Sequence, residues 1–375
     1  MKFIVSSNSL TEALQSINGV LSTKNTLPIL DNYLFVVEGN KLKVVASDIE
    51  TTMEVEVELS MVDGEGSIAI PAKITLDTLR TLPKTPVTFE INLDSKLIEI
   101  STDTGTFKNI GFDAEEFPKV ADIEDSKTVK IPTPFLLRAL SKTHFATGND
   151  EMRPVMMGVN IEFTSRGIIF VGTDAHKLVR YIYKGVTIDE EDSFILPKKP
   201  LNLLRNNLAG YDSEEVTLDY NQTNVRVTTG NLTMTSRLVN GKYPNYEAVI
   251  PLNNPNILIV DRTNFLNTLR RVSIYANQST LQVRLGISGN AMEMSAEDID
   301  YANAGKEHLT VNYTGEDLEI GFNSKFLLEM LQNMDSEQVQ IEMSSPGRAG
   351  ILVPYDVKDE EEEILMLVMP IMLGQ

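Results

Sequence analysis

The sequence repeats itself with a period of 126 residues, and this repeat constrains the possible folds more than any other feature. Phe117-Pro118, Tyr243-Pro244 and Met369-Pro370 follow one another at that spacing, and Ile70-Pro71-Ala72-Lys73 lies 126 residues before Leu196-Pro197-Lys198-Lys199. Several matches at one offset and in one order indicate three copies of one structural unit. We therefore predict three domains that fill the 375 residues without a linker, at 1–125, 126–252 and 253–375.

Each copy has the pattern of an α+β unit, in which two helices pack on an antiparallel sheet. In the first copy, Leu10, Leu14 and Ile17 recur at helical spacing, whereas charged and apolar residues alternate over 54–59 as in a half-buried strand. The runs 33–39 and 41–48 are predicted to form a hairpin. We predict helices at 9–21, 72–82, 134–147, 198–209, 261–277 and 323–334.

Composition excludes several classes of protein. The chain contains no cysteine, which excludes disulfide scaffolds, zinc fingers, iron–sulfur clusters and thiol nucleophiles, and its three histidines lie far apart. The N-terminal apolar stretch is too short for a signal peptide. The longest apolar run, 364–373, has ten residues, whereas a membrane span needs about 20. We expect a soluble, cytoplasmic protein without a metal or a cofactor.

The net charge of −20 alone would disfavour a nucleic-acid partner, but its distribution along the chain favours one. The predicted helices with their flanking residues (9–24, 72–84, 134–147, 198–209, 261–277 and 323–334) sum to +9 over 84 residues, whereas the other 291 residues sum to −29. Basic residues also share helix faces, in the sets Lys73, Arg80 and Lys84, Lys198 and Arg205, and Arg138 and Lys142. Such a surface binds phosphates without reading base sequence, although a single helix of this kind is usually an ordinary solvated face.

Three tandem copies with basic helices and an acidic remainder resemble the bacterial β sliding clamp family, the processivity subunit of DNA polymerase III. The resemblance covers the whole chain and rests on Thr26-Leu27-Pro28-Ile29-Leu30, Thr173-Asp174-Ala175-His176-Lys177-Leu178, Ser236-Arg237-Leu238-Val239, Gly241-Lys242-Tyr243-Pro244-Asn245-Tyr246, Ile320-Gly321-Phe322-Asn323 and Val368-Met369-Pro370. It implies a homodimer without a catalytic site, whose two chains join head to tail into a ring of six units around duplex DNA. It also implies as partners the polymerase III catalytic subunit, the clamp loader and other replication and repair proteins.

The resemblance implies that these client proteins insert short, extended segments with apolar anchors into a pocket between the second and third copies. One part of this pocket is assigned to Met156, Thr173, Ala175, His176, Lys177, Leu178, Pro244, Val249 and Leu367. The other part is assigned to Arg153, Asn323, Phe326, Met369, Pro370, Ile371 and Met372. The family often has Arg at the position of Met372, Tyr at Phe326 and a larger apolar residue at Gly347, so we expect a shifted client preference.

The resemblance also assigns residues to DNA and to the dimer interface. The DNA positions are Lys24, Lys73, Arg80, Lys198 and Lys199, and the shared helix faces add Arg138, Lys142 and Arg205. Asp150 stands where the family can place a neutral residue that contacts DNA. The candidates for the dimer interface are Phe107, Ile274 and Tyr275, which the sequence alone does not distinguish from ordinary core residues.

Two other functions remain open at this point. Asp174 and His176 are a possible catalytic pair, but no nucleophile motif, metal set or phosphate loop accompanies them, and Asp174 is better explained as the brace of a turn, like Asp48 in the first copy. A passive repeat scaffold or an adhesion protein would explain the period and the acidity. It would not explain why basic residues concentrate on the helices.

Overall fold

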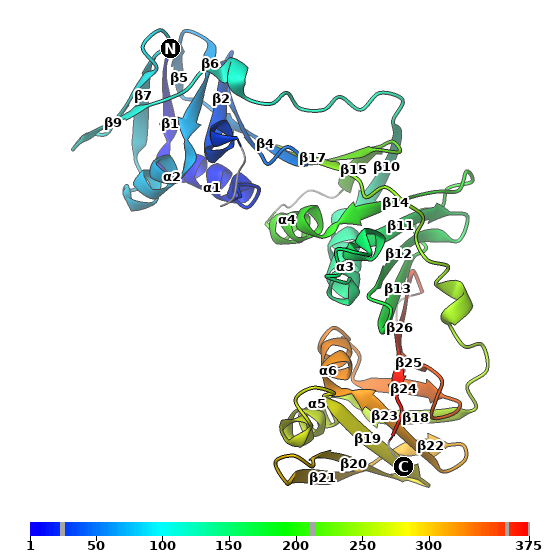
Figure 1. Ribbon diagram of the computed structural model, residues 1–375. Coiled ribbons are helices and arrows are strands. Elements are labelled where there is room, and N and C mark those ends of the chain that lie inside the picture. Colours follow the sequence, from blue (N-terminus) through cyan, green and yellow to red (C-terminus); the bar gives the residue numbers. More distant parts are fainter. Residues whose placement is uncertain (23–26, 211–214, 357–359, 374–375) are drawn as a thin grey trace. The chain divides into compact units, whose positions relative to one another are not determined.

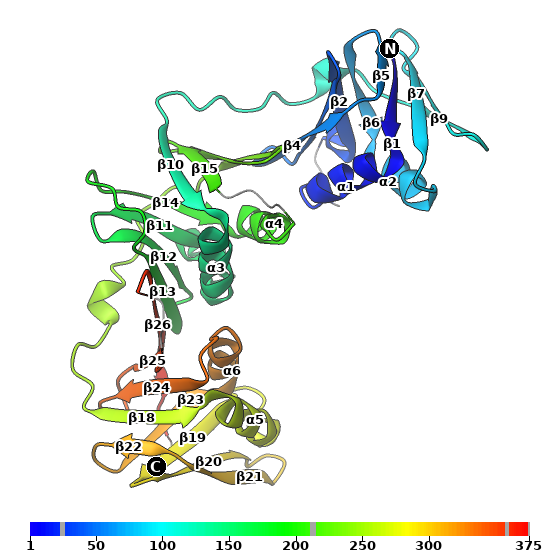
Figure 2. The same ribbon diagram turned by 180° about the vertical axis from the view of Figure 1, so that it is seen from behind.

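Figures 1 and 2 show the computed structural model, which describes residues 1–22, 27–210, 215–356 and 360–373. By packing, the chain divides into two compact units. The first is formed by Met1–Leu136 with Asn202–Leu238, and the second by Leu137–Leu201 with Val239–Gln375. Lys24, one of the predicted DNA residues, lies outside the described residues.

The strands described in the first unit form two antiparallel sheets, ordered β5-β1-β7-β8-β9 and β10-β15-β16-β17-β4-β3-β2-β6. The strands of the first copy are β1 Lys2–Ser6, β2 Asn32–Glu38, β3 Lys41–Ser47, β4 Thr51–Glu58, β5 Met61–Asp63, β6 Gly66–Pro71, β7 Pro86–Asn92, β8 Leu97–Ser101 and β9 Thr106–Ile110. The second copy contributes β10 Lys127–Pro132, β15 Glu215–Tyr220, β16 Asn224–Thr229 and β17 Leu232–Arg237. The predicted hairpin is confirmed, because Glu38 of β2 pairs with Lys41 of β3 across a two-residue turn.

The strands described in the second unit also form two antiparallel sheets, ordered β14-β11-β12-β13-β26-β25-β24-β18-β22 and β21-β20-β19-β23-β27. The second copy contributes β11 Gly158–Thr164, β12 Gly167–Thr173, β13 Lys177–Tyr183 and β14 Asp192–Pro197. The third copy contributes β18 Asn256–Asp261, β19 Gln282–Ser288, β20 Ala291–Asp298, β21 Asn303–Thr310, β22 Asn312–Thr314, β23 Leu318–Asn323, β24 Gln338–Met343, β25 Gly350–Pro354, β26 Glu362–Val368 and β27 Pro370–Ile371.

The six predicted helices are confirmed, with shifts of a few residues at their ends. They are α1 Ser7–Asn18, α2 Ala72–Thr81, α3 Thr133–Thr143, α4 Lys198–Leu208, α5 Arg262–Val272 and α6 Ser324–Gln332. The predictions for α3 and α5 run too long, because each α-helix continues as a 3-10 turn, at His144–Ala146 and Ser273–Tyr275, in which the helical sequence pattern persists. α1 and α2 pack side by side, as do α5 and α6 (Figure 1). The leucines of these helices are buried, except Leu328 of α6, which is partly buried.

The sequence period is reproduced by the structure. The 3-10 helices Pro28–Asp31 and Pro154–Met157 begin 126 residues apart, and so do α2, α4 and α6 in succession. Even an unusual backbone conformation repeats, since Ile49 has φ = 80° and Ala175 has φ = 76°. A left-handed conformation is costly for a β-branched residue such as Ile49, so its presence in both copies indicates that the turn geometry is imposed by the fold.

The sheets run from one copy into the next, and each of these junctions is called a seam below. In the first seam, β4 pairs with β17 and Met53 lies opposite Met234. In the second seam, β13 pairs with β26 and Val179 lies opposite Met366. All four side chains are fully buried. Because a seam is a continuous sheet, packing divides the chain inside its second copy.

No helix among the described residues combines the length and the apolar character that crossing a membrane requires.

Candidate functional site

The turn between β12 and β13 places Ala175 and His176 at the surface. Asp174 Oδ1 accepts hydrogen bonds from the backbone N–H groups of His176 and Lys177, each at 2.9 Å. Thr173 Oγ1 donates to the carbonyl of Lys177 at 2.8 Å. The expected role of Asp174 as a brace is confirmed, and Asp48 has the same role in the first copy, where its Oδ1 accepts from Thr51 N at 2.7 Å.

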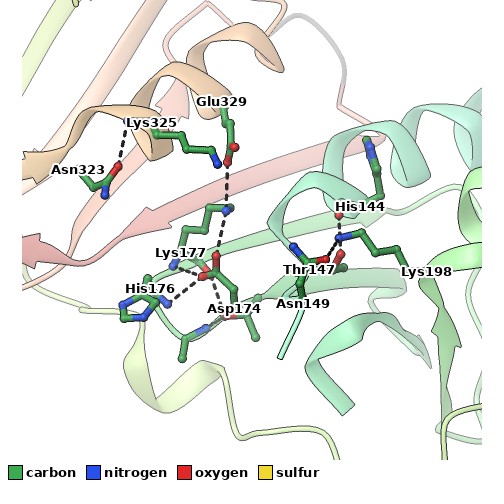
Figure 3. Close-up of polar contacts among 12 residues, drawn as sticks. His144, Thr147, Asn149, Asp174, His176, Lys177, Lys198, Asn323, Lys325 and Glu329 are labelled. Carbon is green, nitrogen blue, oxygen red and sulfur yellow. Dashed lines mark hydrogen bonds and ion pairs between the residues drawn. The ribbon is translucent and has the colours of Figure 1, made fainter. Parts of the chain in front are cut away.

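The imidazole of His176 lies beside the ring of Phe326. It does not lie against the carboxylate of Asp174 (Figure 3). The centroids of the His176 and Phe326 rings are 6.2 Å apart, with an angle of 18° between the ring planes. Asp174 is occupied by backbone N–H groups and by the ammonium group of Lys177. This geometry provides no acid–base pair, so it removes the structural basis for an enzyme that uses these two residues.

The C-terminal strands lie next to this turn. Met369 N donates to the carbonyl of His176 at 2.8 Å, and Leu367 stands opposite Leu178 in the second seam. Leu178 and Leu367 are buried in one apolar cluster together with Tyr246. Beyond Met369, Pro370 and Ile371 pair with β23, and Met372 is exposed. The structure therefore brings the predicted residues of β13 and of the C-terminal strands together.

The other predicted client residues have different surroundings. Asn323 is the N-cap of α6, where its side chain accepts from Lys325 N. The guanidinium of Arg153 pairs with Asp150 at 2.8 Å, and this hydrogen bond is the main cause that lowers the pKa of Asp150. Met156 and Pro244 are half-buried, and Val249 is exposed on the 3-10 helix Glu247–Val249. Below, the predicted client residues other than Lys177 are together called the client surface, because the side chain of Lys177 is buried.

The ammonium group of Lys177 points inward. Its Nζ lies 2.9 Å from Asp174 Oδ2 and 3.0 Å from Glu329 Oε2 (Figure 3). It also lies 4.5 Å from the centroid of the Phe326 ring. Glu329 is not among the residues predicted from the sequence. Its spacing of three residues from Phe326 on α6 places both side chains on one helix face, and this spacing is the sequence signal for it.

The predicted DNA residues of α2 and α4 differ in how far they are exposed. Lys73 and Arg80 are exposed on α2, whereas Lys198, Lys199 and Arg205 of α4 are half-buried. Lys198 Nζ donates to Asn149 Oδ1 at 2.7 Å, and burial, together with the neighbouring Lys177 ammonium, lowers the pKa of Lys198.

Arg138 and Lys142 of α3 instead pair with acidic residues of the third copy. Arg138 Nη2 lies 2.5 Å from Glu362 Oε1, and Lys142 Nζ lies 2.6 Å from Asp335 Oδ2. Lys142 also donates to the backbone carbonyl of Asn333 at 2.6 Å. These ion pairs occupy both charges, so we leave Arg138 and Lys142 out of the proposed DNA surface.

The three candidates for a dimer interface are surface residues. Phe107 of β9 is 39% exposed, and Ile274 and Tyr275 of the 3-10 turn after α5 are 76% and 43% exposed. Large apolar side chains with this exposure are not core residues of the single chain.

Comparison with known proteins agrees with this description. Three family models of the DNA polymerase III beta subunit match this sequence: the N-terminal domain at 1–121, the central domain at 130–245 and the C-terminal domain at 247–371. The beta sliding clamp of Haemophilus influenzae is 30% identical over 346 residues, which cover 91% of this chain and 92% of the relative. That of Pseudomonas aeruginosa is 29% identical over 374 residues, covering 100% of both chains. The crystal structure of a Pseudomonas aeruginosa sliding clamp bound to griselimycin has a TM-score of 0.94 and 28% identity, with 100% of both chains covered. This chain belongs to the DNA polymerase III beta subunit family, the beta sliding clamps.

Proposed function

We propose that two copies of this chain close head to tail into a ring around duplex DNA and tether the polymerase III catalytic subunit, the clamp loader and other replication and repair proteins. The ring acts in the cytoplasm, at the nucleoid, as a processivity factor. Each chain supplies three units, with boundaries near residues 125 and 252. The observation that carries this proposal is that two edge strands have the same positions in their sheets as the strands that form the two seams.

β9 and β21 are the edge strands in question. β9 pairs antiparallel with the strand before it, β8, and the seam strands β17 and β26 pair in the same way with β16 and β25. β21 pairs antiparallel with β20, and the seam strands β4 and β13 pair in the same way with β3 and β12. An edge strand presents backbone N–H and C=O groups that readily pair with another chain. β9 of one chain and β21 of a second chain therefore supply a third seam, and two such seams close a ring.

The two seams within the chain also give the register of the third. On one side, Phe107 occupies the position of Met234 and Met366, because each stands opposite a buried residue of the preceding strand (Ile100, Val227 and Leu352). On the other side, Gly305 occupies the position of Met53 and Val179, because each stands opposite a small residue (Ala296, Ala46 and Gly172). We therefore place Phe107 opposite Gly305 of the partner subunit.

Tyr275 explains why a glycine stands at this seam position. A Cβ atom added to Gly305 would lie 2.6 Å from the ring of Tyr275, so this ring covers the strand where the other seams have a side chain. In the register given above, Phe107 packs against the Tyr275 ring and Ile274 of the partner subunit. The apolar area that these exposed side chains remove from water stabilises the dimer.

The proposed DNA surface consists of Lys73, Arg80, Lys198, Lys199 and Arg205, with Lys24 as a sixth position outside the described residues. These cations neutralise phosphates without contacts that distinguish bases. Weak direct affinity is sufficient, because a closed ring stays on DNA by topology and must remain free to slide.

We further propose that client proteins bind the client surface through a short extended segment. Apolar side chains such as Leu178, Leu367 and Met369 accept apolar anchors, and flexible methionines suit more than one partner. A labelled peptide from the clamp-binding segment of the polymerase III catalytic subunit is a suitable probe. Griselimycin, which is bound to the Pseudomonas aeruginosa clamp, is tested as a competitor.

The proposed ring is tested by its dependence on DNA topology. The protein is loaded by its clamp loader onto nicked circular DNA, and half of the sample is then linearised with a restriction enzyme. We expect the protein to remain on the circle during gel filtration and to leave the linear molecule. Equal retention on circular and linear DNA would contradict encirclement and favour an ordinary binding surface or a scaffold.

A further inference from the structure

The ammonium group of Lys177 is buried, and client binding alone does not explain this burial. Lys177 is 6% exposed, although it stands in the turn that carries the exposed His176. Removing an ammonium group from water is costly unless it is paired. Here it is paired with carboxylates from two different copies: Asp174 of the second copy and Glu329 of the third.

The same division of charge runs along the whole second seam. In the ion pairs across this seam that the described residues form, the basic partner belongs to the second copy and the acidic partner to the third: Arg138–Glu362, Lys142–Asp335, Lys177–Glu329, Arg180–Glu363 and Lys184–Glu363. The ion pair described in the first seam, Arg237–Glu50, is largely exposed at 3.5 Å. Partly buried pairs are screened by salt much less than exposed ones. Ion pairing thus fixes the second seam, over which the client surface extends, more firmly than the first.

Among these pairs, Lys177–Glu329 is the one adjoining the client surface. Lys177 follows His176 in the turn, and Glu329 lies one helical turn after Phe326 on α6. The Lys177 ammonium also lies over the Phe326 ring, a favourable cation–π position, while the His176 ring lies beside the same aromatic ring. This single cation therefore connects the two copies at the point where His176 and Phe326 meet.

We propose that Lys177 and Glu329 are positioning residues for client binding: their ion pair holds α6 against the His176 turn, so that His176, Phe326 and Met369 are preorganised before the client arrives. This inference rests on the proposed function and deepens it. Lys177 acts through its neighbours, because its buried side chain is directed at Asp174 and Glu329 and not at the surface. A preorganised site binds more tightly because ordering it costs less.

The test measures the affinity of the peptide probe by fluorescence anisotropy for wild type, Lys177→Met, Glu329→Gln, the double variant and Lys177→Arg. Lys177→Met keeps most of the aliphatic side chain and removes the ammonium group from Asp174 Oδ2 and Glu329 Oε2, so we expect affinity to fall at least tenfold. Glu329→Gln is expected to cost about threefold to tenfold, and the double variant less than the product of the two single effects. Lys177→Arg restores the charge and is expected to bind within threefold of wild type.

Lys142→Met is the matched control, because the Lys142 side chain is similarly buried, pairs with Asp335 of the third copy across the same seam and is not one of the client residues. We expect it to leave peptide affinity within twofold. Hydrogen exchange at the Met369 amide, which donates to the carbonyl of His176, is expected to accelerate in Lys177→Met and not in Lys142→Met.

Three results would overturn the inference: unchanged affinity in both Lys177→Met and Glu329→Gln, an equal loss in Lys142→Met, or no rescue by Lys177→Arg. If Lys177→Met does not fold, Glu329→Gln decides alone, through its peptide affinity and its exchange at the Met369 amide. A wild-type protein that does not bind the probe would instead count against the proposed client surface, so the two failures are distinguishable.

Discussion

Truncating Ile274 tests the proposed dimer most directly. Its side chain is 76% exposed in the single chain and, in the proposed third seam, it packs against Phe107 of the partner subunit. Ile274→Ala removes little that stabilises the single chain, so we expect the variant to fold normally. In contrast, the dimer loses apolar contact at both of its seams.

The size of this loss follows from the exposed fraction. Fully burying an isoleucine side chain is worth about 1.5–3 kcal/mol, and roughly three-quarters of that, about 1–2 kcal/mol, is still to be gained at each seam. Two seams double the effect to about 2–4 kcal/mol. Because 1.4 kcal/mol corresponds to a factor of ten, the dissociation constant of the dimer is expected to rise roughly 30- to 700-fold.

Sedimentation equilibrium over a wide concentration range measures this constant. Leu252→Ala is the control, since Leu252 is 99% exposed and lies outside β9, β21 and the turn that carries Ile274. We expect the control to leave the dimer unchanged. A change of less than threefold in Ile274→Ala, or an equal change in Leu252→Ala, would refute the proposed position of the seam.

Four further predictions follow from the structure. The chain has no cysteine, so the double variant Thr106→Cys/Lys306→Cys is expected to form a disulfide-linked dimer on oxidation. The control Thr106→Cys/Glu307→Cys, one residue out of register, is expected not to form this dimer, and the reverse outcome would shift the proposed register. Changing Lys198, Lys199 and Arg205 to Glu is expected to reduce loading onto DNA and its salt dependence, and unchanged loading would remove α4 from the DNA surface. His176→Ala/Met369→Ala is expected to weaken binding of the peptide probe at least tenfold while gel filtration still shows a dimer, and unaltered affinity would contradict the assigned client surface. Burial raises the pKa of Glu162 above its ordinary value of 4.5, so the folded chain binds this proton more tightly than the unfolded chain, and the contribution of Glu162 to stability is lost as pH rises through the raised pKa. Glu162→Gln is therefore expected to gain thermal stability relative to wild type as the pH is raised from 4 to 8, and a difference that does not vary with pH would contradict this cause.

Much of the candidate site could be predicted from residues that are close together in the sequence. The turn at 173–177 is an example, because Asp174 makes its hydrogen bonds to the next two or three residues, as an aspartate in a turn commonly does. The identity of the neighbours across the seam could not be predicted in this way. Arg138 and Lys142 have the helical spacing of a basic DNA surface, yet their partners are Glu362 and Asp335 of the third copy.

The sequence by itself determined the number of copies, the six helices and the first hairpin. These features depend on periodicity and on turn residues, which act over a few positions of the chain. Only the tertiary structure decided that the sheets continue from copy to copy, that β9 and β21 are left as edges, and that Lys177 is buried between Asp174 and Glu329. The physical reason is that a strand edge or a charge does not encode its partner locally. Pairing depends on which distant segments the packed core brings within hydrogen-bonding distance.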